Sequence, residues 1–86
     1  MDLGGEVGLE FTAPAVPVRV EVLDERGRCV RTLLQGTLPA GPVRERWDGK
    51  DDAGRPLPRG RYRLRARTYT YTQLLVEKVV ELDPAP

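Results

Sequence analysis

Apolar and polar residues alternate along most of this chain with the two-residue period of a half-buried β-strand. In residues 17–24 the pattern is clearest, because three valines would face one way while Arg19 and Glu21 face the other. Similar alternation predicts strands at 7–12, 28–35, 43–47, 61–71 and 77–82, the last with apolar residues 74–76 before it. Apolar residues do not recur with helical spacing over any helix-length segment, so no helix is predicted.

Glycine and proline separate these strands. The sequence Asp-Glu-Arg-Gly at 24–27 predicts a hairpin turn. Two glycines and two prolines at 36–42 exclude a central strand and predict a loop that crosses from one sheet to another. The turn within 70–73 carries neither residue, so its position is the least defined by sequence. About six to seven short strands with turns between them predict an all-β fold, an antiparallel sandwich or a small barrel.

The longest loop, residues 48–60, organises this pattern, because it joins a strand ending in tryptophan to a strand starting near a tyrosine. It contains Asp-Gly, Ala-Gly, two prolines and a closing glycine, which supply the backbone angles of a tight return. Trp47 is the only tryptophan. Burying such a ring removes about 150 to 250 Å² of surface from water, so Trp47 is predicted to be the central core residue.

Composition changes this picture little. The 86 residues suit a single domain, 1–86, with short tails at 1–6 and 83–86, and a net charge of +1 gives no overall field toward nucleic acid or membrane. Cys29 is the only cysteine, which excludes an internal disulfide. We interpret it as a small apolar strand residue rather than a reactive thiol. The N-terminus lacks the pattern of a signal peptide, and no segment has the roughly 18 apolar residues of a membrane span.

No set of residues suggests catalysis. Histidine and serine are both absent, which excludes Ser/His nucleophilic chemistry, and carboxylate pairs such as Asp24 and Glu25 fall in turns without an apolar neighbour to raise a pKa. No catalytic residue and no cofactor is therefore predicted. Asp48, Asp51 and Asp52 could hold calcium. We favour turn capping for them instead, because aspartate bonds nearby backbone N–H groups in tight turns, and we predict no metal site.

Arginines form the most unusual surface. One strand face would carry the candidate partner-binding residues Arg61, Arg63, Arg65, Arg67, Tyr69 and Tyr71. Arginine and tyrosine are enriched in protein interfaces, and the same face could hold an anionic polymer such as nucleic acid. The interpretation that we favour is a solvated face whose charges pair across strands with Glu21, Glu77 or Glu81.

A family resemblance is carried by a spaced series of residues. It comprises 18–24, Gly27, Arg28, 30–33, Ala40, Gly41, Trp47-Asp48-Gly49, Asp51, Gly54, Leu57-Pro58, Gly60, Tyr62 and Ala66. Over about residues 16–67 the chain resembles the immunoglobulin-like domain of the FlgD family, named for the flagellar hook-capping scaffold and found also at the end of secreted bacterial proteins. The resemblance implies a fibronectin-like β-sandwich without catalytic residues, with a motif-bearing core at about 16–82 and a fold signature of Trp47, Asp48, Gly49, Gly54, Gly60 and Tyr62.

Two departures from the family are visible. Glu45 shares the face of Trp47 by alternation, where the family usually carries an apolar residue, so either the strand bulges or Glu45 lies at the edge of the core and pairs with an arginine. The chain also lacks the N-terminal export and anchoring region of a complete hook-capping protein. We therefore expect a noncatalytic module that attaches to protein partners through sheet edges or the arginine face, exported or at the cell surface if it belongs to a larger protein. The alternative is a small domain that binds anions or nucleic acid.

Overall fold

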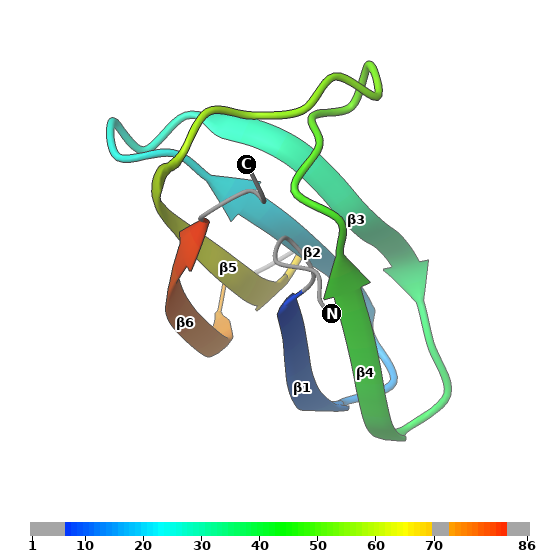
Figure 1. Ribbon diagram of the computed structural model, residues 1–86. Helices are drawn as coiled ribbons and strands as arrows, with labels where there is room; N and C mark the ends of the chain where they lie inside the picture. Colours follow the sequence, from blue (N-terminus) through cyan, green and yellow to red (C-terminus); the bar gives the residue numbers. More distant parts are fainter. Residues whose placement is uncertain (1–6, 70–72, 83–86) are drawn as a thin grey trace.

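Every regular element in the described residues, 7–69 and 73–82 of the computed structural model, is a β-strand (Figure 1). The strands are β1 (Val7–Ala13), β2 (Pro17–Leu23), β3 (Cys29–Thr37), β4 (Gly41–Trp47), β5 (Gly60–Thr68) and β6 (Leu74–Leu82). Within these ranges the chain forms no helix with the length and apolar character needed to cross a membrane.

The strands form two antiparallel sheets. Among the described residues, one sheet contains four strands in the order β3, β2, β5, β6, and the other contains β1 and β4. Figure 1 shows the β1–β4 pair lying across the larger sheet. The predicted hairpin at 24–27 joins β2 to β3, and Gly27 closes it by donating its N–H to the Asp24 carbonyl oxygen at 2.9 Å. The all-β, immunoglobulin-like sandwich that the sequence predicts is confirmed, with six strands in the described residues.

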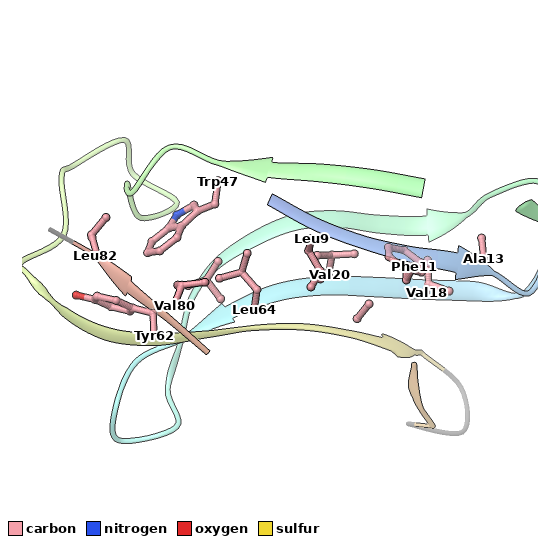
Figure 2. Close-up of a cluster of buried hydrophobic side chains, with 12 residues drawn as sticks. Leu9, Phe11, Ala13, Val18, Val20, Trp47, Tyr62, Leu64, Val80 and Leu82 are labelled. Atoms are coloured by element: carbon pink, nitrogen blue, oxygen red, sulfur yellow. The ribbon is translucent and has the colours of Figure 1, made fainter. Parts of the chain in front are cut away.

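Alternation along the strands builds the core. The inward side chains of β2 and β5 are buried, and those of β1 cover them from the second sheet (Figure 2). The members of this core are Leu9, Phe11, Ala13, Val18, Val20, Val22, Trp47, Tyr62, Leu64, Ala66, Val80 and Leu82. Because burial of apolar surface is the main favourable term in folding, this layer is what holds the two sheets together.

Trp47 closes one end of the core with its whole side chain excluded from water. Its ring meets Tyr62 edge to face, with 5.3 Å between the ring centroids and an interplanar angle of 63°. Each ring also satisfies its polar atom, since Trp47 Nε1 donates to the Lys50 carbonyl oxygen at 2.9 Å and the Tyr62 hydroxyl donates to the Pro58 carbonyl oxygen at 2.7 Å. Both acceptors lie in the 48–60 loop, so the core and the loop fix each other.

Two predicted boundaries were wrong. The crossing loop predicted at 36–42 is shorter, because Gly36 and Thr37 still belong to β3 while Gly41 and Pro42 already belong to β4. Proline is tolerated there because, within ranges 7–69 and 73–82, β4 has a strand neighbour on one side alone, so a missing N–H can face the other edge. The strand predicted at 61–71 runs from Gly60 to Thr68, which leaves Tyr69 beyond its end.

Replacing Trp47 with alanine should lower the free energy of unfolding by about 3 to 5 kcal/mol, because it leaves a cavity between the sheets and removes the anchor of the loop. Urea unfolding followed by circular dichroism measures the change. Val79→Ala is the control, because the Val79 side chain is exposed on β6 and its truncation should cost within about 0.5 kcal/mol. A loss below about 1 kcal/mol for Trp47→Ala would show that the indole does not hold the sandwich together.

Candidate functional site

The aspartates of the 48–60 loop organise its backbone. Asp48 accepts the Lys50 N–H at 3.1 Å, and one oxygen of Asp51 accepts both the Ala53 and the Arg55 N–H groups at 2.9 Å. The hydrogen bond from the Arg55 backbone is the largest influence on Asp51 and, with the bond from Ala53 and the Arg55 charge, holds the pKa of Asp51 below its ordinary value despite some desolvation. The turn-capping role predicted for these two side chains is confirmed.

Two glycines make the sharp bends of this loop possible. Gly49 and Gly54 both have φ of about +82°, a left-handed conformation that strains other residues. Both belong to the predicted fold signature, and their position explains why that signature contains glycine. The signature residues therefore shape the return from β4 to β5.

Asp52 forms hydrogen bonds to β3 of the larger sheet instead of capping its own turn. Its carboxylate accepts the Thr32 N–H at 3.0 Å, and its backbone N–H donates to the Val30 carbonyl oxygen at 3.2 Å. These two bonds occupy the outer edge of β3, where an unpaired strand would otherwise present free backbone groups. In the part of the chain that the structure describes, no group of three or more histidine, cysteine, aspartate or glutamate residues is arranged to hold a metal ion.

Arg31 joins the loop to β3, a role that the sequence analysis did not predict. One terminal nitrogen of its guanidinium contacts the Asp48 carboxylate at 3.2 Å, the Lys50 carbonyl oxygen at 3.0 Å and the Asp51 carbonyl oxygen at 3.3 Å. The Lys50 oxygen thus receives both this arginine and the indole N–H of Trp47. Nothing in the local pattern distinguishes Arg31 from the other arginines, because the interaction exists only once the loop lies over β3.

The outward arginines of β5 all contact carboxylates. Arg61 pairs with Glu81 at 3.1 Å in an exposed ion pair, and Arg63 approaches Glu77 at 4.0 Å. Both glutamates lie on β6, and register places Glu81 directly opposite Arg61. The cross-strand charge pairing that we favoured from the sequence is thus present along this face.

Arg65 and Arg67 differ from these two because they share one buried carboxylate, Glu21. Glu21 Oε1 accepts from Arg65 Nε at 3.1 Å, from an Arg65 terminal nitrogen at 2.8 Å and from Arg67 Nε at 2.9 Å. Arg19 approaches the other oxygen, Oε2, at 3.2 Å. Only 2% of Glu21 is exposed, so the three guanidinium groups cover it completely. We call Arg19, Glu21, Arg65 and Arg67 the Glu21 cluster.

Electrostatics keep Glu21 ionised. Burial by itself would raise the pKa of Glu21, but hydrogen bonds from Arg67 and Arg65, together with their positive charges, hold that pKa below its ordinary value. A neutral glutamic acid at this position would leave three guanidinium groups without a counterion. The cluster is therefore a permanently charged part of the sheet face at neutral pH.

The remaining candidates of the arginine face are tyrosines. Tyr69 is 47% exposed and is anchored by its backbone N–H, which donates to the Pro17 carbonyl oxygen at 2.8 Å. Tyr71 lies outside the described residues. Cys29 begins β3 and is exposed, so it is a strand residue as predicted, but it does not pack in the core.

Comparison with known proteins places this geometry in a family. The profile of the FlgD Ig-like domain matches residues 1–71, which is most of the chain. The chain belongs to the FlgD Ig-like domain family. It is 42% identical over 57 residues to the basal-body rod modification protein FlgD of Salmonella typhimurium, and equally to that of Salmonella typhi. The match covers 66% of this chain but 25% of those proteins, so the chain corresponds to about a quarter of their length.

Solved FlgD structures share the fold. The structure of FlgD from P. aeruginosa matches with a TM-score of 0.68 and 27% identity, covering 94% of this chain and 65% of that one. A truncated FlgD from Helicobacter pylori matches with a TM-score of 0.54 and 19% identity, covering 90% of this chain and 61% of that one. The resemblance identified from the fold signature is thus confirmed.

Glu45 departs from the apolar character expected at this position of a FlgD Ig-like domain. It lies in β4 opposite the buried Leu9 and is half-buried. The residues that the structure describes form no ion pair or hydrogen bond with its carboxylate, so the predicted arginine partner is absent from them, and β4 pairs with β1 without a bulge. Burial raises the pKa of Glu45.

Glu21→Gln should destabilise the domain at pH 7 by about 1 to 3 kcal/mol, because three guanidinium groups lose their shared counterion while they keep some contact with water. Since the folded pKa of Glu21 lies below its unfolded value, its contribution is complete above that unfolded value and is lost as pH falls through the folded pKa. The difference between variant and parent should therefore shrink on acidification below about pH 4.5.

Urea unfolding at a series of pH values measures this difference. Asp24 and Asp51 also make the stability of the domain sensitive to acid, because the pKa of each is lowered in the folded protein. Their contribution cancels when the variant is compared with the parent, since both proteins contain these aspartates. Glu81→Gln is the control, because it breaks only the exposed pair with Arg61 and should change stability little. A difference for Glu21→Gln that stays constant down to pH 3 would contradict the proposed counterion role.

Glu45→Gln should behave in the opposite way and stabilise the domain at pH 7, because the folded protein then no longer desolvates an unpaired charge. Since the folded pKa of Glu45 is raised, the parent regains this stability as pH falls through that pKa. The advantage of the variant should therefore vanish toward pH 4. Thermal unfolding at both pH values tests this, and a destabilised variant at pH 7 would show that Glu45 makes a favourable interaction.

Proposed function

We propose that the chain is a noncatalytic assembly module that attaches its parent polypeptide to other protein subunits of a flagellar structure. The observation that supports this proposal most strongly is the 42% identity to proteins named as basal-body rod modification proteins. The chain then belongs to a larger exported protein, in which this domain holds position rather than transforms a substrate. The signature residues support this role, because Trp47, the two glycines and Tyr62 all serve the fold.

The sheet edges offer a route for attachment. Asp52 and its loop occupy the first part of the β3 edge, and the Lys78 ammonium donates to the Gly8 carbonyl oxygen of β1 at 3.0 Å. β4, like the other terminal strands of the two sheets, has one edge without a strand neighbour among the described residues. Such an edge can pair with an extended segment of another protein, and backbone hydrogen bonds would then supply the affinity.

Nucleic-acid binding receives less support. A nucleic-acid surface needs a continuous positive track along the phosphates. Here Glu21, Glu77 and Glu81 alternate with the arginines of β5 and neutralise part of their charge. The assembly hypothesis is therefore the one that we put forward.

Photo-crosslinking in cells that produce the full-length parent protein tests this function. A photoreactive residue replaces Arg44, which is exposed on β4, and in a second variant it replaces Ala53 at the tip of the loop as the control. The expected product joins the Arg44 variant to a structural subunit of the flagellum, and the Ala53 variant gives much less of it. Mass spectrometry identifies the partner. Products with unrelated proteins only, or no product from Arg44, would overturn the assembly role at this edge.

A further inference from the structure

The Glu21 cluster carries more positive charge than it neutralises. Three guanidinium groups surround one carboxylate, so two positive charges lack a counterion within the cluster. We propose that Arg19, Arg65 and Arg67 form a binding site for a carboxylate side chain on an extended acidic segment of a partner protein. The inference rests on the proposed function, because this segment would belong to an assembly partner.

Several exposed arginines elsewhere each pair with a separate carboxylate. Examples are Arg44–Glu10 between β1 and β4, Arg28–Asp24 in the hairpin, Arg55–Asp51 in the long loop and Arg61–Glu81 between β5 and β6. Three arginines depend on a single carboxylate only in the Glu21 cluster, as far as the described residues show. An incoming carboxylate would therefore gain most at this place on the surface.

The cluster is also preorganised. Register places Glu21 opposite Arg65 and Arg19 opposite Arg67, so the backbone ladder of β2 and β5 fixes all four positions. The arginine side chains are only 26%, 32% and 19% exposed for Arg19, Arg65 and Arg67. Binding would then cost little additional side-chain entropy, because hydrogen bonds to Glu21 already restrict Arg65 and Arg67.

Hydrogen-bonding capacity remains available. An arginine has five N–H donors in a planar fork that matches a carboxylate. Glu21 accepts from Nε and one terminal nitrogen of Arg65 but only from Nε of Arg67, while the buried Arg19 Nε faces Glu21 and is closed to a ligand. The site thus combines surplus charge with donors that Glu21 does not use.

Neighbouring charges favour a single carboxylate over a polyanion. Along β6, Glu77 lies opposite Arg65 in the register and approaches Arg63, Glu81 pairs with Arg61, and their negative charges would repel successive phosphates of a nucleic acid. A protein segment can place one glutamate or aspartate over the cluster and turn neutral side chains toward β6. We therefore commit to an acidic protein segment as the occupant.

Nuclear magnetic resonance of the arginine Nε–H groups in the full chain tests the proposal. The probe is a short synthetic peptide of alternating threonine and valine with one central glutamate, and the control peptide has glutamine in its place. The glutamate peptide should shift the signals of Arg19, Arg65 and Arg67, while the glutamine peptide should not. Arg19→Gln should weaken binding by about fivefold, because one cation is lost while Glu21 keeps both hydrogen-bonded partners.

Two variants separate binding from folding. Arg55→Gln removes an exposed arginine from the long loop, away from both proposed binding surfaces, and should leave peptide affinity unchanged. Arg19→Lys keeps the charge but loses the planar fork, so its affinity should fall between those of the parent and Arg19→Gln. Urea unfolding confirms that each variant is folded at the temperature of the titration.

Several outcomes would overturn the carboxylate site. These are equal binding of the two peptides, an equal loss of affinity in Arg55→Gln, absence of any shift, or binding of a single-stranded oligonucleotide in preference to the peptide. If the peptide fails to bind while crosslinking at Arg44 still captures a flagellar subunit, the carboxylate site is wrong and the assembly role stands. If the peptide binds but no flagellar subunit is captured, the carboxylate site stands and attachment through the β4 edge is wrong.

Discussion

The fold depends on how the Trp47 ring is fixed at the end of the sandwich. The indole is buried between the sheets, and its N–H reaches the Lys50 carbonyl oxygen, which Arg31 also contacts from β3. One carbonyl oxygen thus connects the apolar core, the long loop and the larger sheet. Tyr62 repeats the arrangement, because its ring packs on Trp47 while its hydroxyl bonds the loop at Pro58. A loop with little apolar surface of its own is held in place in this way.

Carboxylates on the larger sheet and carboxylates in the long loop have different hydrogen-bond partners. In the loop, carboxylates such as Asp51 satisfy backbone N–H groups, which is a structural use of charge close to the chain itself. On the sheet, Glu21 satisfies side chains from two strands and is itself covered by them. A buried carboxylate of this kind adds specificity to the pairing of β2 with β5, because another register would leave it unpaired in a poorly hydrated place.

Backbone conformation and packing show which residues this member of the family needs for its fold. Glycines at 49 and 54 and the rings of Trp47 and Tyr62 are required by backbone conformation and packing. Glu45 shows that the same scaffold tolerates a half-buried carboxylate near the core, at a cost that its raised pKa reflects. The surfaces that would distinguish one member of the family from another are therefore the strand edges and the charged face, since neither is needed to close the core.

The sequence alone determined the strands, the sandwich and the central place of Trp47, because alternation, turn residues and a single large ring are local signals. It also placed Glu21 and the β5 arginines on one solvent-facing side. Only the tertiary structure decided which carboxylate each arginine meets, because that depends on register between strands distant in sequence. The same holds for Arg31, whose partners come from a loop that must first fold over β3, and for the end of β5, where pairing with β2 stops at Thr68 although alternation continues.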